Sequence, residues 1–370
     1  MVRVGEIAAN QPLSESDKAF VKLIQENNKT HIVDKTQLAE LLVQAQEVYA
    51  AHFDKTVWFE RSIFTNWTCG IADCKYCYLS TKPKLDMSAL RSQESILAEA
   101  LLMNLMGWRV GYITGGLRVE STPQMIQLLQ NLAVVLGEKP MMNFGPYTKT
   151  EVAQLAPFVS GMGSAIESFD PDLHRFICPS KPLSALLKFL GYLQEQKLKK
   201  LITIILGIGE KMSDVDQVIA YVKQYEITTV QLCFLKPQEY TVFAQTSPPN
   251  PDYMAWWCAK LRIACPDLII KIALVKDRIG DFSLMLRAGA NCFSRYMVFS
   301  DFASSFATEL EVECQNANRE LAGNFSVVPQ FDIEQIMSEL ALAEDLKDKI
   351  KPKLVSYIKR LEKLAAKNNI

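Results

Sequence analysis

Short apolar runs alternate along the chain with longer stretches in which apolar residues recur every three or four positions. Apolar runs of this length are typical of buried strands, and the periodic stretches are typical of amphipathic helices. Eight strands are predicted, at Val57–Asn66, Val110–Gly116, Pro140–Gly145, Val159–Ser168, Leu201–Gly207, Thr228–Leu235, Leu268–Leu274 and Cys292–Phe299. Because helical segments separate them, the pattern predicts a parallel sheet of the α/β class.

Eight strand–helix units in roughly 250 residues suit a closed (β/α)8 TIM-type barrel. An open, doubly wound sheet is the alternative, since a sequence does not show closure. Further helices are predicted on both flanks, at Glu15–Glu26, Thr36–Ala51, Ile333–Leu342 and Leu346–Ala366. We therefore expect an N-terminal helical extension (1–56), a barrel (57–300) and a C-terminal helical cap (301–370).

Composition and charge narrow the possible partners. The 370 residues are 49% hydrophobic, which is enough for one large core, and the net charge of −1 gives no reason to expect nucleic acid. No apolar run approaches the ~18 residues that a membrane-spanning helix needs. The first twenty residues lack the apolar segment of a secretory signal. We expect a cytoplasmic protein without a membrane partner.

Three of the nine cysteines, Cys69, Cys74 and Cys77, form a C-x4-C-x2-C pattern directly after the first predicted strand. The other six are scattered, and an odd total argues against a disulfide framework. In a barrel, the segment that follows a strand lies at the face where active sites are found. This pattern is the strongest chemical signal in the sequence.

Three thiolates with no neighbouring histidine suit an iron–sulfur cluster, because soft sulfur ligands favour iron in that form. Three ligands for four irons leave one iron open to a small molecule. A structural zinc would need a fourth Cys or His from elsewhere in the fold, and this alternative stays open.

The loop resembles the cluster motif of the radical S-adenosylmethionine (SAM) superfamily, whose common form is C-x3-C-x2-C with an aromatic before the third cysteine. Tyr76 matches the aromatic, and the first spacing is one residue longer. The resemblance implies a [4Fe–4S] cluster whose open iron chelates the amino and carboxylate groups of SAM. One electron then breaks the sulfonium and produces a 5′-deoxyadenosyl radical.

Three later segments resemble the SAM contacts of the biotin synthase and hydrogenase maturase branch. Gly115-Gly116 resembles the glycine pair that approaches the methionyl amino group, although Leu117 stands where the family usually has an acid. Glu167 and Arg175 resemble the acid at the ribose or amino group and the base at the carboxylate; a surface ion pair is the alternative. Gly207 and Gly209 resemble the family's Gly-x-Gly-Glu segment. No residue is assigned to catalysis itself.

The reaction is less defined. Ile177-Cys-Pro-Ser-Lys-Pro182 and the cysteine loop resemble archaeal biotin-synthase-related proteins, some of which are two-subunit lipoyl synthases. The resemblance implies sulfur insertion into a protein-bound octanoyl chain, with a second iron–sulfur cluster as sulfur source. Cys178, Cys233 and Cys292 are the candidate ligands of that cluster. The implied partners are a reductant such as ferredoxin, a lipoyl carrier protein and a homologous second subunit.

Two alternatives remain. A single-cluster enzyme of the hydrogenase maturase type would make a small metabolite or a hydrogenase cofactor, with Asn143, Lys236 and Arg295 as candidates for binding an anionic substrate. A non-catalytic zinc or iron–sulfur protein is the third possibility.

Overall fold

A computed structural model describes residues 14–274 and 276–368. Residues 1–13, which belong to the predicted N-terminal extension, lie outside the described residues, as do 275, 369 and 370. Within the described part no helix is both long and apolar enough to cross a bilayer.

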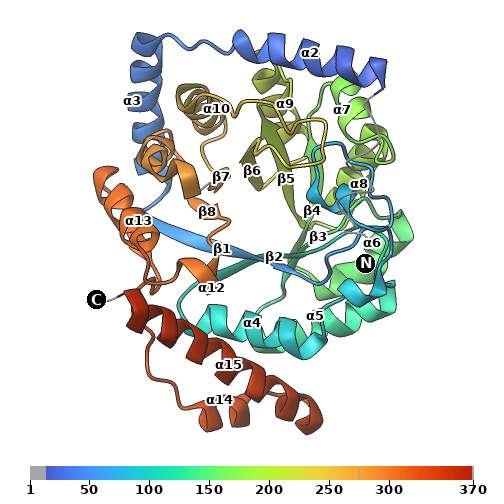
Figure 1. The fold of residues 1–370 in the computed structure, drawn as a ribbon, viewed down its shortest axis with the longest axis vertical. Coiled ribbons are helices and arrows are strands. Elements are labelled where there is room, and N and C mark those ends of the chain that lie inside the picture. Colours follow the sequence, from blue (N-terminus) through green and yellow to red (C-terminus); the bar gives the residue numbers. More distant parts are fainter. Residues whose placement is uncertain (1–13, 275, 369–370) are drawn as a thin grey trace.

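Eight parallel strands form a closed barrel, in which β1 pairs with both β2 and β8 (Figure 1). The strands are β1 (Thr56–Phe64), β2 (Arg109–Thr114), β3 (Met141–Asn143), β4 (Gly161–Glu167), β5 (Lys199–Leu206), β6 (Thr229–Phe234), β7 (Ile269–Ala273) and β8 (Cys292–Ser294). The prediction of a (β/α)8 barrel is confirmed, and the open sheet is excluded by the β1–β8 pairing.

Two features near the C-terminal end of the barrel differ from the prediction. The last strand ends at Ser294, because Arg295 adopts a positive φ of 68° that interrupts the extended backbone. A ninth strand, β9 (Glu320–Ala322), pairs in parallel with the start of β1. The segment after residue 300 therefore contributes a strand to the sheet as well as helices.

Helices cover the outside of the barrel (Figure 1). They are α4 (Gln93–Leu105), α5 (Thr122–Leu136), α6 (Lys149–Leu155), α7 (Pro171–Ile177), α8 (Leu183–Glu195), α9 (Asp214–Gln224), α10 (Pro251–Ala264), α11 (Phe282–Arg287), α12 (Val298–Asp301) and α13 (Ser305–Asn316). Short 3-10 turns are η1 (Tyr78–Thr81), η2 (Met87–Ala89), η3 (Ala156–Phe158) and η4 (Lys276–Asp281). Local signals set the ends: α5 starts at a Ser121–Gln124 capping box and stops at left-handed Gly137.

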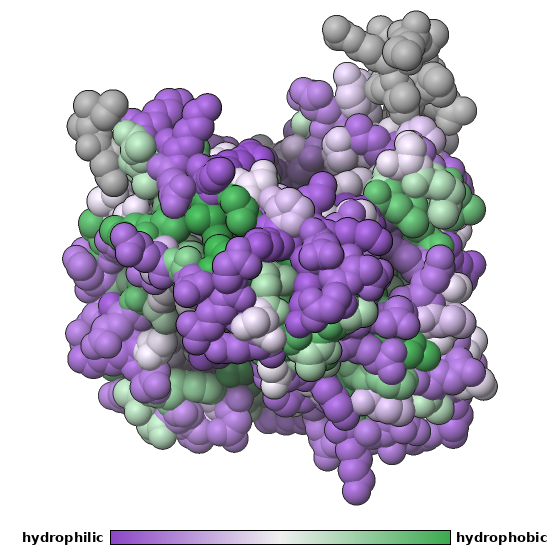
Figure 2. Space-filling model, turned by 90° about the horizontal axis from the view of Figure 1, so that it is seen from below, coloured by the Kyte–Doolittle hydropathy of each residue, from purple (hydrophilic) through white to green (hydrophobic). Residues whose placement is uncertain are grey.

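The flanking helices are α2 (Glu15–Lys29), α3 (Lys35–His52), α14 (Ile333–Glu339) and α15 (Glu344–Asn368). Helix α2 lies at the top of Figure 1, and α14 and α15 lie at the bottom. Figure 2 views the molecule from that lower side and shows a largely hydrophilic surface with hydrophobic residues gathered in a few separate places.

The barrel interior carries charge as well as apolar side chains. Glu60 of β1 forms a buried ion pair with Lys271 of β7, and the Tyr112 hydroxyl donates a hydrogen bond to Gln231 at 3.1 Å. The Lys271 ammonium also lies 4.9 Å from the Tyr112 ring centre. Buried charges are costly unless they are paired, and here Glu60 and Lys271 pair with each other. We call Glu60, Tyr112, Gln231 and Lys271 the polar floor of the barrel; in most barrels of this type the interior is filled by apolar side chains.

Candidate active site

The cysteine loop follows β1 and gathers its three thiols in one small cluster. Cys69 is buried, Cys74 and Cys77 are half-buried, and all three pack with Ile71 and Leu79. The backbone N–H groups of Ala72 and Leu117 point at the Cys69 sulfur, at 3.4 and 3.3 Å. Such donors stabilise a thiolate. Burial raises the pKa of the Cys77 thiol to about 11.

The donor set fits an iron–sulfur cluster. Among the residues that the structure describes, no three Cys, His, Asp or Glu side chains converge on one metal ion. A [4Fe–4S] cluster does not need such a point, since each of its thiolates binds a different iron. Three soft donors in one partly buried loop, with N–H groups directed at sulfur, are what such a cluster requires.

The glycine pair at the end of β2 packs against the cysteine loop. A side chain at Gly116 would overlap the Thr68 carbonyl, and a Cβ at Gly115 would lie 2.6 Å from the Asn66 amide nitrogen. The Gly116 N–H donates to Asn66 Oδ1 at 2.8 Å. Only glycine allows this approach of backbone to backbone, so the pair sets where the cysteine loop lies.

Glu120 takes part in the same junction, and the sequence analysis missed it. Its carboxylate accepts hydrogen bonds from Thr65 Oγ1 at 2.6 Å and from Asn66 Nδ2 at 2.8 Å. The resemblance to the family predicts an acid directly after the glycine pair, where Leu117 stands. An acidic residue three positions later, just before a helix N-cap, was the available signal.

Glu167 connects the cysteine loop to the barrel. It is buried at the end of β4, with an unusual positive φ of 65°. Its carboxylate accepts hydrogen bonds from the Tyr76 hydroxyl at 2.7 Å and from Thr203 Oγ1 at 3.0 Å. A left-handed non-glycine residue costs roughly 1–3 kcal/mol, and such strain is concentrated at functional sites. The structure thus brings two predicted residues, Tyr76 and Glu167, into contact.

The structure does not bring Arg175 to this site. Arg175 lies on the exposed face of α7 and pairs with Asp172 at 2.9 Å, which is the alternative that the sequence left open. The base beside Glu167 is instead Lys181, which is buried with its ammonium 3.5 Å from the carboxylate. Although burial disfavours the charged form, the Glu167 carboxylate raises the pKa of Lys181, which therefore stays protonated.

The Gly207–Glu210 turn after β5 is closed on itself. The Glu210 carboxylate accepts hydrogen bonds from the N–H groups of Gly207 and Gly209, at 2.7 and 3.1 Å. Both glycines have positive φ, of 86° and 121°. From α2, Asn28 Nδ2 donates to the Gly207 carbonyl at 2.9 Å. The N-terminal helix therefore covers this turn.

Helix α2 also reaches the cysteine loop. Asp17 forms an ion pair with Lys75, which stands between Cys74 and Cys77. Phe20 stacks on Phe176 with ring centres 4.1 Å apart. Ile24 is buried with Cys178 and Cys233 in one apolar group. One helix thus connects the cysteine loop and the Gly207–Glu210 turn.

The three candidate ligands of a second cluster lie in two different surroundings. Cys178 packs in one apolar group with Cys74, and Cys233 accepts a hydrogen bond from Gln231 at 3.4 Å. Cys292 faces Glu60 at 3.8 Å, in the polar floor. Cys178 and Cys233 share one apolar group and Cys292 lies outside it.

The other candidate substrate-binding residues are dispersed. Lys236 and Arg295 are exposed at the ends of β6 and β8. Asn143 is half-buried on β3, where a Cβ on Gly163 would lie 2.6 Å from its side chain. The structure shows no contact that joins these three residues.

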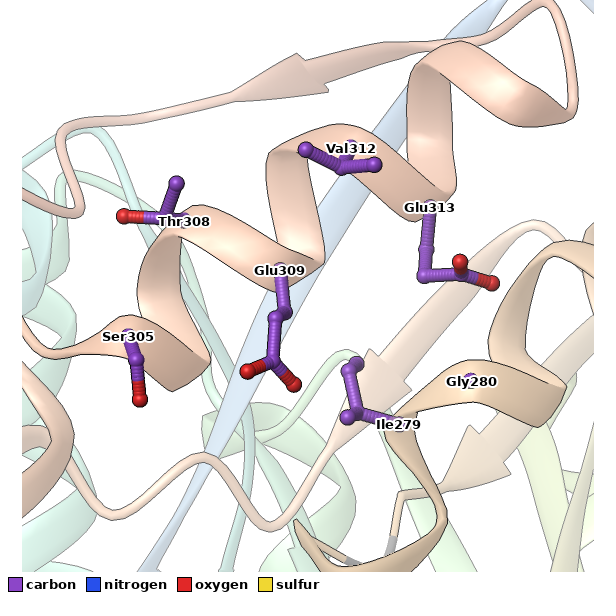
Figure 3. A pocket seen from close by; sticks show the side chains of 7 residues that line it. All are labelled: Ile279, Gly280, Ser305, Thr308, Glu309, Val312 and Glu313. Carbon is purple, nitrogen blue, oxygen red and sulfur yellow. The ribbon is translucent and has the colours of Figure 1, made fainter.

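A cavity of about 540 Å³ opens beside the cysteine loop. Glu120, Tyr147 and Lys181 line it, together with residues of the loops that follow β1 to β4. Its volume is within the roughly 300–1,000 Å³ of small-molecule sites. A pocket of about 400 Å³ between η4 and α13 contains none of these residues; Figure 3 shows it lined by Ile279, Glu309 and Glu313.

Comparison with known proteins decides the family. Residues 68–222 match the radical SAM superfamily. An uncharacterized protein of Methanocaldococcus jannaschii is 30% identical over 351 residues, which cover 89% of this chain and 97% of that protein. The chain belongs to the radical SAM superfamily. Its cofactors are a [4Fe–4S] cluster and SAM.

Further similarities place this radical SAM enzyme near the biotin synthase and maturase branch. Biotin synthase of Thermotoga neapolitana is 25% identical over 226 residues, covering 59% of this chain and 81% of the relative. The fold matches the FeFe-hydrogenase maturase HydG from Carboxydothermus hydrogenoformans with a TM-score of 0.65 at 17% identity, over 99% of this chain and 96% of HydG. The family and the fold predicted from the sequence are confirmed.

Proposed function

We propose that Cys69, Cys74 and Cys77 bind the [4Fe–4S] cluster and that SAM lies between this loop, Glu120, Glu167 and Lys181. The cavity beside the loop offers the space. When bound, the cluster supplies the electron that cleaves SAM to a hydrogen-abstracting radical. The observation that carries this proposal is the hydrogen bond from Tyr76 to Glu167, which joins the two motifs.

Each protein group has a role that follows from its chemistry. The Lys181 ammonium is protonated and buried, so it can hold the carboxylate of SAM without competition from water. Glu167 accepts hydrogen bonds from Tyr76 and Thr203 and is fixed in place before SAM binds. Gly115 and Gly116 leave room for Asn66 and Thr68 of the cysteine loop, and Gly207 and Gly209 leave room for Pro249 and Ile24, so that these segments pack closely around the site.

For the reaction, we favour a single-cluster enzyme that acts on a small metabolite or builds a cofactor. Cys292 lies with Glu60, apart from Cys178 and Cys233, and the interior holds the charged Glu60–Lys271 pair. Charged groups suit a polar substrate better than an octanoyl chain. Sulfur insertion of the lipoyl type, with a carrier protein and a second subunit, is the second candidate. The similarity to biotin synthase and the packing of Cys178 with Cys233 and Cys74 in one group favour it.

Iron content and SAM cleavage test the cluster assignment. Anaerobically reconstituted protein should hold about four irons per chain and release 5′-deoxyadenosine with dithionite and SAM. Changing Cys69, Cys74 and Cys77 together to Ala should remove both. About eight irons, with half retained in the triple variant, would instead support the second cluster. Sulfur gain by an octanoylated carrier peptide, read by mass spectrometry, would then identify lipoyl synthesis.

The SAM site is tested by a matched pair of basic residues. Lys181→Met should weaken SAM binding to the reconstituted protein at least tenfold, about 1.4 kcal/mol, because the carboxylate loses its cation. Arg175→Met removes a base that pairs with Asp172 on the surface, and this variant should leave SAM binding unchanged. Equilibrium dialysis under anaerobic conditions measures both. If Arg175→Met weakened SAM binding and Lys181→Met did not, Arg175 and not Lys181 would be the contact of the SAM carboxylate.

A further inference from the structure

Large exposed apolar side chains are concentrated beside the cysteine loop. Trp67, Tyr78 and Leu85 are each 49% exposed, and Met87 is 61% exposed. All four belong to the segment from the end of β1 to α4 that contains the three cysteines. Exposed apolar groups of this kind mark interaction surfaces when they adjoin one another.

Backbone contacts hold these side chains in one region. The Trp67 N–H donates to the Ala89 carbonyl at 3.0 Å, which sets Trp67 against η2, the turn that begins at Met87. Thr68 Oγ1 accepts a hydrogen bond from the Asp86 N–H at 2.9 Å, which holds the stretch around Leu85 against the start of the loop. Leu85 itself has a positive φ of 53°, a strained conformation for leucine, and yet remains exposed.

The same region is locally basic, although the whole chain has a net charge of −1. The Lys82 ammonium lies 4.5 Å from the Tyr78 ring centre, and Lys84 is exposed next to Leu85. Neither lysine forms an ion pair with any described residue, whereas Lys75 is neutralised by Asp17. Asp86, which caps η2, is the one acid among residues 78–87, against two lysines. We call Trp67, Tyr78, Lys82, Lys84, Leu85 and Met87 the docking face.

We propose that the docking face binds a small acidic electron-transfer protein that reduces the cluster. This inference rests on the proposed function, because it assumes the cluster on Cys69, Cys74 and Cys77. Trp67 is two residues before Cys69, and Tyr78 directly follows Cys77. A donor on this face therefore contacts residues that flank the cluster ligands, which favours it because electron transfer slows steeply with distance.

The chemistry of the face suits such a donor. One electron passes from the donor's iron–sulfur centre, which is oxidised, to the enzyme's cluster, which is reduced; no bond forms and no proton moves. Redox encounters use small interfaces, below roughly 1,200 Å², and aromatic and methionine side chains are enriched in interface cores. The two unpaired lysines would steer an acidic partner.

Two reductants separate this proposal from the proposed function. The reconstituted enzyme is assayed for 5′-deoxyadenosine, once with dithionite and once with an acidic ferredoxin kept reduced by its reductase. The double variant Lys82→Glu/Lys84→Glu should raise the ferredoxin concentration for half-maximal rate at least tenfold and leave the dithionite rate unchanged. Lys363→Glu, an exposed lysine on α15, is the matched control and should change neither. Added salt should raise the ferredoxin concentration that the wild type needs for half-maximal rate, because it screens the lysines. The difference between the wild type and the double variant should therefore become smaller.

A second variant tests the apolar part. Leu85→Asn/Met87→Ser should raise the same ferredoxin concentration about threefold or more, while Val327→Ser, an equally exposed apolar residue elsewhere, should not. An equal loss with both reductants, or no loss with ferredoxin, would overturn the proposal. The proposal would also be overturned if the wild type formed product with dithionite but not with reduced ferredoxin. It would equally be overturned if the double variant lost only self-association or the binding of a carrier protein. Absence of product with dithionite in the wild type would instead refute the proposed function.

Discussion

The two helical extensions have similar sequence patterns and different relations to the site. Helix α2 buries only Ile24, yet it contacts the cysteine loop through Asp17 and the Gly207 turn through Asn28. Helix α15 buries four apolar residues and packs on α4 and α12, away from the cysteines. A long amphipathic helix in this protein thus contributes stability, whereas a weakly buried one contributes to the site.

This difference has a physical cause. Stability scales with apolar area removed from water, and α15 buries Ile350, Leu354, Ile358 and Leu361. Helix α2 is held by a few hydrogen bonds and ion pairs and by the apolar side chains of Phe20 and Ile24. It can therefore detach from the barrel at a lower free energy than the barrel needs to unfold. Four substitutions test the contrast, from the largest expected effect to the smallest.

Leu361→Ala should lower the free energy of unfolding by about 3 kcal/mol, because it leaves a cavity where a fully buried side chain packs. The affinity for SAM should stay unchanged. Denaturant unfolding and anaerobic SAM binding measure the two quantities, with Lys363→Ala on the exposed face as control. A loss of SAM affinity without a loss of stability would erase the distinction between the helices.

Ile24→Ala should destabilise the docking of α2 by about 2 kcal/mol and affect global unfolding less than Leu361→Ala does. Amide hydrogen exchange should become faster in α2 and in the Gly207–Glu210 turn, and remain slow in the barrel strands. Uniformly faster exchange across the protein would show that α2 unfolds only together with the barrel.

Asn28→Ala should cost about 1 kcal/mol, the value of its hydrogen bond to the Gly207 carbonyl, and should weaken SAM binding several-fold by loosening that turn. Asn104→Ala is the matched control, because it removes a similar bond to the Val135 carbonyl at 3.1 Å on the outer face. Both variants should lose comparable stability, and only Asn28→Ala should lose SAM affinity.

Asp17→Asn should have the smallest effect, below about 1 kcal/mol, because the ion pair with Lys75 is partly exposed. It should accelerate the loss of iron to a chelator about twofold, since the segment between Cys74 and Cys77 loses its anchor. High salt should abolish the difference from the wild type. An effect that persists in high salt would indicate packing rather than charge.

Part of the site was predictable and part was not. Cys69, Cys74 and Cys77 could be named from the sequence because the ligands of one cluster are expected in one short loop, and Glu167 because a conspicuous motif ends a strand. The base that the structure places beside Glu167 is Lys181, whereas the sequence pattern predicted Arg175, although both follow Glu167 closely. Their distance along the chain does not reveal that α7 turns Arg175 outward and that the following loop turns Lys181 inward.

The sequence alone determined the order of eight strands and helices, the cysteine loop and the family, because these depend on neighbouring residues and local periodicity. Only the tertiary structure decided which side chains meet. Closure of the barrel brings Tyr76 to Glu167, buries Lys181 beside them and places Cys292 outside the apolar group that contains Cys178 and Cys233. The tertiary structure also brings α2 into contact with the cysteine loop, which begins some forty residues after the end of this helix. Such contacts depend on strand pairing and packing over long separations, which no local pattern encodes.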